Sequence, residues 1–214
     1  VSVQLIFFTT LHLNYKRYLK LYMPKTMLTR YLLPALCLFL LVPAFAKGKP
    51  QAIDTSKSRV TFTVNMLGVP VSGTVPITSG FYTPQAGDGM DGKQAAVILD
   101  MRKANGGGEE INTEIHKPEW LSTEKFPTAS FVLQSLKPLK TVGSYSATGK
   151  LTLKGRVLTI TAPTTMTGAS HHPQQFTSRF NVLRSQFDIG SGEWNDPDVV
   201  SLNVTVDVKL VLLP

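Results

Sequence analysis

The sequence has 214 residues, with 22 Lys and Arg against 14 Asp and Glu, which gives a formal net charge of +8 at pH 7. Five of the basic residues and none of the acidic ones lie in residues 1–46, so residues 47–214 carry a net charge of only +3. That balance argues against a nucleic-acid-binding protein with a basic face, and a hydrophobic content of 43% excludes wholesale disorder.

Residues 23–46 have the pattern of a secretory signal peptide. Lys25 and Arg30 precede an uncharged, apolar run of 16 residues, which ends in an Ala-Phe-Ala triplet at Ala46. A basic segment, an apolar segment and a small-x-small end are the parts of such a signal, so we expect cleavage after Ala46. A membrane anchor is the less favoured alternative, because a membrane span needs about 20 apolar residues. The mature protein is therefore predicted to be periplasmic or secreted.

Residues 1–22 are predicted to be an untranslated or disordered upstream extension. A signal peptide begins a few residues before its apolar run, which favours Met23 or Met27 as the start. The only cysteine, Cys37, falls within the signal peptide. Residues 47–214 therefore form one cysteine-free domain, without a disulfide, a thiol nucleophile or a cysteine metal ligand.

Hydrophobic and polar residues alternate along this domain. In residues 60–66 and 200–210 every second residue is hydrophobic, and those between them are Thr, Ser, Asn, Asp or Lys. Successive side chains of a strand point to opposite faces, so this pattern predicts strands that are buried on one face. Six further strands are predicted at residues 69–81, 95–101, 128–136, 144–153, 157–167 and 176–183.

One segment departs from the alternation and predicts a helix. Residues 109–121 begin with acidic residues, which favour a helix start, and Ile111, Ile115 and Leu121 lie near one face. We expect the helix to end or kink at Pro118. An all-β fold of eight mostly antiparallel strands with one short helix fits a closed barrel or a sandwich.

The residues expected to face inward are compatible with either a hollow or a filled interior. An eight-stranded barrel is either filled by side chains or holds one small ligand. Small inward residues favour a cavity, whereas small and large residues that interlock would fill the core. The small ones are Ala95, Ala129, Ala147, Gly149 and Ala162, and the bulky ones are Phe131, Tyr145, Phe176 and Phe180.

The histidines do not form a convincing metal site. His171 and His172 are adjacent, so they point to opposite faces of an extended segment, and His116 lies in the predicted helix region. Zinc normally takes three or four protein ligands. We predict no metal ligand and no cofactor.

Paired carboxylates also have simpler explanations than catalysis. Glu109 and Glu110 stand where a helix start favours acids, and Asp196 and Asp198 flank a proline in a predicted turn. The sequence contains no G-x-S-x-G nucleophile motif. We therefore predict no catalytic residue and interpret the protein as a non-enzyme.

Four short segments follow one another in a characteristic order. They are SRVTF at residues 58–62, FPTASF at 126–131, YSATGKLTLKG at 145–155 and RSQFDIG at 184–190. In this order and spacing they resemble the YceI-like family of bacterial exported proteins, also called the polyisoprenoid-binding family. The resemblance covers residues 53–212. The chain departs from the family at residues 102–108 and at Lys154, where the family often has His.

The resemblance implies an eight-stranded antiparallel barrel of lipocalin type with an apolar tunnel for an isoprenoid or another long-chain amphiphile. We accordingly expect a polyisoprenoid, quinone-like or fatty-acyl ligand, with transient membrane contact and a homodimer as open alternatives. Two rival hypotheses are an interaction module with a filled barrel and, less favoured, a lipid-processing enzyme. The predicted ligand-binding residues are Phe62, Val64, Phe131, Leu133, Tyr145, Leu151, Phe176 and Phe180.

Overall fold

The computed structural model describes residues 49–84, 94–169 and 172–214. The predicted signal peptide at residues 23–46, the upstream residues 1–22 and His171 all lie outside the described residues.

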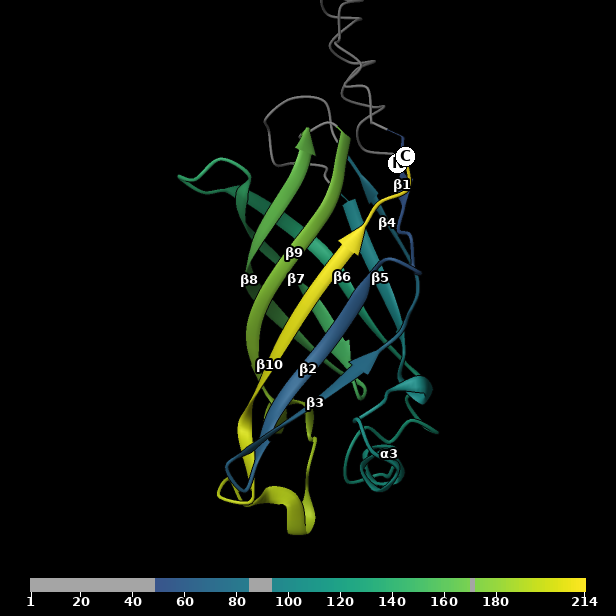
Figure 1. Cartoon of the computed structure of the whole chain (residues 1–214), viewed down its shortest axis with the longest axis vertical. Coiled ribbons are helices and arrows are strands. Elements are labelled where there is room, and N and C mark those ends of the chain that lie inside the picture. Colours follow the sequence, from purple (N-terminus) through teal and green to yellow (C-terminus); the bar gives the residue numbers. More distant parts are fainter. Residues whose placement is uncertain (1–48, 85–93, 170–171) are drawn as a thin grey trace, which may run out of the picture. The chain divides into compact units, whose positions relative to one another are not determined.

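The described residues form one antiparallel sheet, which is curled into a half-barrel (Figure 1). The strands are β1 (Gln51–Ala52), β2 (Arg59–Met66), β3 (Val69–Val75), β4 (Ile77–Thr83), β5 (Gln94–Asp100), β6 (Thr128–Pro138), β7 (Ser144–Leu153), β8 (Arg156–Ala169), β9 (His172–Leu183) and β10 (Val200–Val211). Their order in the sheet is β1-β4-β5-β6-β7-β8-β9-β10-β2-β3. The predicted all-β, antiparallel architecture is confirmed.

The described residues form ten strands rather than the predicted eight. Pro76 divides the segment predicted as one strand at residues 69–81 into β3 and β4, and the short β1 is an addition. Proline has no N–H to give to a ladder, so the chain turns there and changes partners. β3 pairs with β2, whereas β4 pairs with β5 and β1. The eight-stranded, lipocalin-like detail of the prediction is thus not confirmed.

The predicted helix is present as α3 (Glu109–Ile115), and it is shorter than residues 109–121. It stops three residues before Pro118, because the residue before a proline disfavours helical backbone angles. The described part of the chain also contains three short 3₁₀ helices, η1 (Met101–Lys103), η2 (Arg184–Phe187) and η3 (Gly192–Asn195). Within the described ranges, no helix has the length and hydropathy needed to cross a membrane.

The register aligns the alternating residues of neighbouring strands on one face. Val206 of β10 is paired with Phe62 of β2 on one side and with Phe180 of β9 on the other. In β6 the register shifts between Leu133 and Ser135. A bulge of this kind adds one residue to a strand, so Leu136 takes the inward place that strict alternation gives to Ser135, and it is only 2% exposed.

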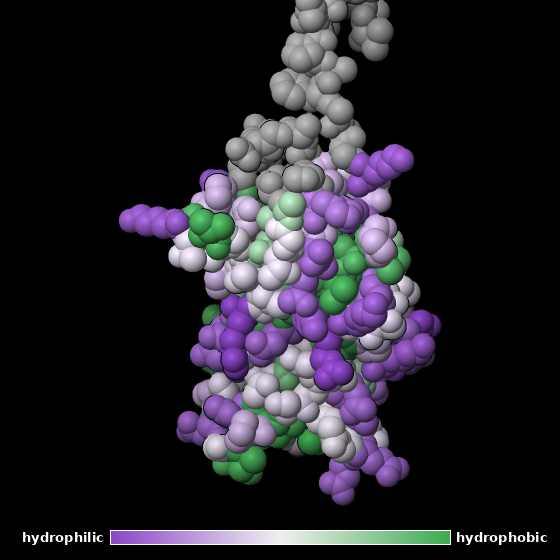
Figure 2. All heavy atoms as spheres, turned by 45° about the horizontal axis from the view of Figure 1, so that its top comes forward, coloured by the Kyte–Doolittle hydropathy of each residue, from purple (hydrophilic) through white to green (hydrophobic). Residues whose placement is uncertain are grey.

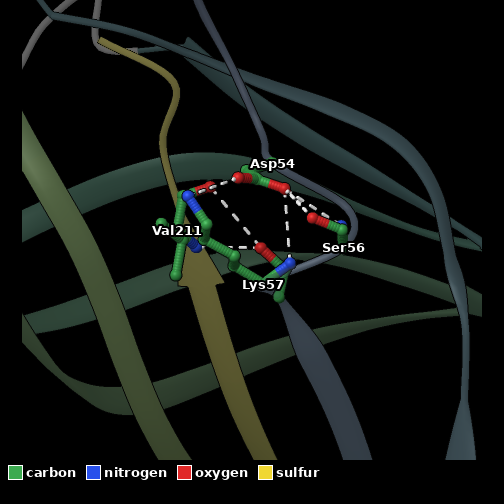
Figure 3. A network of polar contacts seen from close by, with 5 residues as sticks. Asp54, Ser56, Lys57 and Val211 are labelled. Atoms are coloured by element: carbon green, nitrogen blue, oxygen red, sulfur yellow. Dashed lines mark hydrogen bonds and ion pairs between the residues drawn. The ribbon is translucent and has the colours of Figure 1, made fainter.

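Asp54 ties the turn between β1 and β2 to the end of β10 (Figure 3). Its Oδ1 accepts hydrogen bonds from the N and Oγ of Ser56 and the N of Lys57, at 3.1, 2.6 and 3.3 Å. Its own N–H donates to the Val211 carbonyl oxygen at 2.8 Å, and the Val211 N–H donates to Ser58 Oγ at 2.9 Å. The hydrogen bond from the Ser56 side chain is the largest cause that lowers the pKa of Asp54 below 3.8.

We expect Asp54→Asn to destabilise the fold at neutral pH and much less at acid pH. A carboxyl whose pKa is lowered by folding contributes stability above its unfolded pKa and loses that contribution as the pH falls through the folded value. Urea unfolding of both proteins at pH 7 and pH 2.5 measures the difference. A gap between the two midpoints that stays the same at both pH values would contradict a role for the Asp54 charge.

Candidate ligand-binding cavity

The concave side of the sheet borders an apolar cavity of about 520 Å³. Side chains from all the described strands except β1 line it, and nearly all of them are hydrophobic. Its volume lies in the range of about 300–1,000 Å³ that is usual for small-molecule sites. The outer surface in Figure 2 is largely hydrophilic, with hydrophobic residues in separate groups. The interior is therefore hollow, which is one of the two alternatives that the sequence allowed.

Seven of the eight predicted ligand-binding residues line this cavity. The exception is Tyr145, which is not part of the lining but packs against a core cluster whose members Leu136, Ala147 and Phe176 line the cavity. Contact of these residues with a ligand stays a prediction. The seven that line the cavity are Phe62, Val64, Phe131, Leu133, Leu151, Phe176 and Phe180.

Two glycines leave space for the aromatic rings of this wall. A Cβ atom at Gly149 would overlap the ring of Phe131, and a Cβ at Gly73 would overlap the ring of Phe62. Each ring therefore lies over the bare backbone of the neighbouring strand, a packing in which an aromatic side chain covers a strand glycine. Because the rings occupy the space that a side chain at Gly73 or Gly149 would fill, they project less into the cavity.

Arg184 is the one cation among the described residues that line the cavity, and its guanidinium is fully used. The residue is 2% exposed, and burial lowers its pKa. All five of its N–H groups donate to backbone carbonyl oxygens, which fixes the segment of η2 and η3 against the start of β10. The acceptors are Ser201 from Nε at 3.1 Å, Ile189 and Gly190 from Nη1 at 3.0 and 2.7 Å, and Trp194 and Val200 from Nη2 at 2.7 and 2.8 Å.

The helix α3 contributes two acids to the lining, Glu110 and Glu114, together with Ile111 and Ile115. Glu110 is exposed as well as cavity-lining, so the cavity meets solvent at α3. The Oε2 of Glu114 also accepts from the Nζ of Lys117 at 2.5 Å. From the sequence, Glu110 was explained only as an acid at a helix start, and its place in a cavity wall was not predicted.

Two residues of the lining have a buried donor without a hydrogen-bond partner among the described residues, the Tyr82 hydroxyl and the Trp120 Nε1–H. Burial, with a smaller effect of Tyr145, raises the pKa of Tyr82 to about 12, so the hydroxyl stays protonated at neutral pH. Its ring packs against Phe176, with centroids 5.0 Å apart. Trp120 packs in the same way against Trp194 of η3, at 5.6 Å.

The described candidate metal ligands, His116 and His172, are not part of the cavity lining. Across residues 49–84, 94–169 and 172–214, no group of three or more His, Cys, Asp or Glu could hold a metal ion. His116 hydrogen-bonds to Thr123 through Nδ1 at 3.2 Å, and His172 Nδ1 lies 3.1 Å from Gln51 Nε2.

The two predicted carboxylate pairs are accounted for by local structure. Asp196 accepts the Asp198 N–H at 2.9 Å, the turn that the sequence predicts. Glu109 and Glu110 form the acidic first turn of α3, and only Glu110 of the two reaches the cavity lining.

The fold and the cavity together define an all-β protein with an apolar binding cavity. The chain belongs to the YceI-like family, whose domain model matches residues 51–212. None of the curated protein sequences compared with the chain matches it.

Solved structures share the fold. BcnA of Burkholderia cenocepacia is 26% identical, with a TM-score of 0.68 over 74% of this chain and 98% of that one. A polyisoprenoid-binding domain from Saccharophagus degradans, implicated in plant cell wall breakdown, is 14% identical, with a TM-score of 0.56 over 76% and 97%. A YceI protein of Campylobacter jejuni is 12% identical, with a TM-score of 0.53 over 66% and 84%.

We expect Arg184→Met to lower the free energy of unfolding by about 3 kcal/mol or more, because buried carbonyl oxygens that lose a donor cost about 1–3 kcal/mol each. Urea unfolding measures the change. The matched control is Arg179→Met, whose side chain is 73% exposed and pairs with Asp207 at 3.5 Å. That control should change stability by about 0.5 kcal/mol or less. Equal losses in both variants would refute the structural role of Arg184.

We expect Gly149→Ala to displace the Phe131 ring and to destabilise the protein by about 1–3 kcal/mol, the usual cost of overpacking. Urea unfolding and a crystal structure of the variant test both effects. Gly108→Ala is the control, since a Cβ there would meet nothing within 4 Å. An unchanged Phe131 ring and an unchanged midpoint in Gly149→Ala would show that the glycine is not needed for this packing.

Proposed function

We propose that the protein binds one long-chain amphiphile, a polyisoprenoid or a similar chain, in the apolar cavity. The observation that carries the proposal is a cavity of about 520 Å³ with an almost wholly hydrophobic lining in a member of the YceI-like family. The structural neighbour from Saccharophagus degradans, which is described as a polyisoprenoid-binding domain, supports the same class of ligand. A quinone-like or fatty-acyl chain would meet the same lining.

Burial of the chain supplies the binding free energy in this proposal. Each CH₂ group that leaves water contributes about 0.8 kcal/mol, so about ten such groups give several kcal/mol even after the loss of ligand freedom. The lining needs no specific pocket for each carbon atom. A smooth wall of aliphatic and aromatic side chains therefore suits a long chain better than a compact polar metabolite.

The proposed role is to carry, store or sequester this amphiphile outside the cytoplasm. The pattern of residues 23–46 supports an exported protein, because it has the parts of a secretory signal. An amphiphile with a long apolar chain is poorly soluble in water, so a carrier that covers the chain would hold it in the periplasm or in the medium. This role requires no catalytic group.

We expect Ala95→Phe to block uptake of a long-chain probe and Ala96→Phe to leave it intact. The two alanines are neighbours in β5, but Ala95 lines the cavity and Ala96 is outside the lining, opposite Phe81 and Val132 in the register. A phenyl ring at Ala95 would fill part of the cavity. A phenyl ring at Ala96 would instead lie beside the exposed hydrophobic side chains of Phe81 and Val132. Titration with the fluorescent parinaryl alcohol measures uptake, and circular dichroism checks that both variants fold.

The expected result is saturation near one probe per chain for the wild type and for Ala96→Phe, with affinity reduced at least about tenfold in Ala95→Phe. Uptake that is equal in both variants would place the probe outside the cavity. A wild-type protein that takes up no probe would favour the rival hypothesis, an interaction module that acts through its surface.

A further inference from the structure

We propose that the turn between β6 and β7 docks the protein on a membrane surface that contains anionic lipids. Leu139 and Val142 enter the surface layer of the membrane, and Lys137 and Lys140 contact the lipid phosphate groups. This docking goes beyond the proposed function, because the turn is not part of the cavity lining.

The turn holds two aliphatic side chains in solvent. Val142 is 100% exposed and Leu139 is 51% exposed. Figure 1 shows this turn reaching outward beyond the neighbouring strands, at the end of the sheet away from α3. Transfer of a Val or Leu side chain out of water is favourable, and from a projecting tip both can enter a bilayer together.

Hydrogen bonds fix the shape of the turn. The Leu139 N–H donates to the Ser144 carbonyl oxygen at 2.9 Å, and the Ser144 N–H donates to the Thr141 carbonyl oxygen at 3.0 Å. The Gly143 carbonyl oxygen accepts from the Met166 N–H at 2.7 Å, which ties the turn to β8. Gly143 closes the turn with a φ of +76°, a left-handed conformation that glycine adopts without strain. The aliphatic side chains are therefore presented to solvent without a rearrangement.

Two lysines flank these side chains. Lys137 and Lys140 are exposed, and neither has an ion-pair partner among the described residues. A lysine beside an anionic lipid surface increases the affinity by about fivefold. Its long stem also lets the ammonium group reach the phosphates while neighbouring apolar side chains lie deeper. The turn thus combines the two contacts that a charged lipid surface offers.

The charges of the described residues are divided between the two ends of the sheet. At the end with α3, residues 100–125, 154–156 and 184–198 hold 10 acidic and 7 basic side chains. The remaining described residues hold 2 acidic and 8 basic ones. An anionic surface therefore attracts the side of the molecule that carries the turn and repels the end with α3.

The turn between β2 and β3 carries the same two residue types without the charge. Its Leu67 and Val69 are 75% and 60% exposed. Residues 60–84 contain no charged side chain, and the turn lies at the same end of the sheet as α3 (Figure 1). Exposed aliphatic side chains alone thus do not distinguish the two turns. The lysines and the surrounding charge select the turn between β6 and β7.

The docking turn continues two strands of the cavity wall. Leu136 of β6 and Ala147 of β7 face each other in the register, and both line the cavity. An amphiphile with a long apolar chain resides in membranes rather than in water. If the proposed function holds, the docked protein therefore has its cavity wall beside the source or destination of its ligand.

Co-sedimentation with vesicles tests the docking. Vesicles of phosphatidylcholine with about 30% phosphatidylglycerol are compared with vesicles of phosphatidylcholine alone. Leu139→Ser with Val142→Ser should weaken binding to the anionic vesicles at least about tenfold. The matched control, Leu67→Ser with Val69→Ser, should bind within about twofold of the wild type. All variants keep residues 1–48, so a difference between them reports the turn alone.

Lys137→Gln with Lys140→Gln tests the charge of the turn. We expect the wild type to prefer the anionic vesicles about tenfold or more, and this variant to prefer them about twofold or less. The control is Lys103→Gln with Lys125→Gln, which removes two exposed lysines at the end with α3 and should keep the wild-type preference.

Uptake of parinaryl alcohol distinguishes this proposal from the proposed function, and every variant should keep the wild-type uptake. Equal losses of vesicle binding in the two aliphatic double variants would overturn the assignment to this turn. A protein that takes up the alcohol and binds neither kind of vesicle would overturn the docking and would favour a protein partner for the turn. A protein that binds the anionic vesicles through the turn and takes up no alcohol would support the docking and contradict the proposed function.

Discussion

Everything in this structure depends on one constraint: the inward face of a curled antiparallel sheet is apolar and yet does not fill its own interior. Alternation turns Val60, Phe62 and Val64 of β2 inward, and the neighbouring strands do the same in register. Alanines in the wall and the glycines beneath Phe62 and Phe131 limit how far side chains reach across. Protein interiors normally pack densely. A ligand would therefore fill the space of about 520 Å³ that the side chains of this lining leave open.

A second constraint concerns charge at the end of the sheet where α3 lies (Figure 1). A buried guanidinium would attract an anion if its donors were free, but the carbonyl oxygens around Arg184 saturate it and turn it into a clamp for the segment between β9 and β10. Glu110 of α3 also lines the cavity, and it is exposed. The same end of the molecule thus combines a buried structural cation with an exposed acid at the cavity wall.

Local patterns predicted much of this arrangement, and long-range pairing accounts for what they missed. Alternation in residues 60–66 and 200–210 predicted β2 and β10, because which face a residue takes in a strand is set by its neighbours in sequence. The effect of Pro76 depends on β3 and β4 having different partners, and the bulge in β6 depends on its register with β7, neither of which a single segment reveals. The hydrophobic lining followed from the same alternation. The roles of Glu110 and Arg184 did not, because they are set by where α3 and the η2–η3 segment pack.

Native mass spectrometry of the protein, purified without detergent and then offered one equivalent of a long-chain isoprenoid alcohol, tests the central claim most directly. We expect a single adduct per chain, either co-purified or formed on addition, with the mass of one long-chain amphiphile. A protein that is free of ligand after purification and remains free of the added alcohol would contradict it.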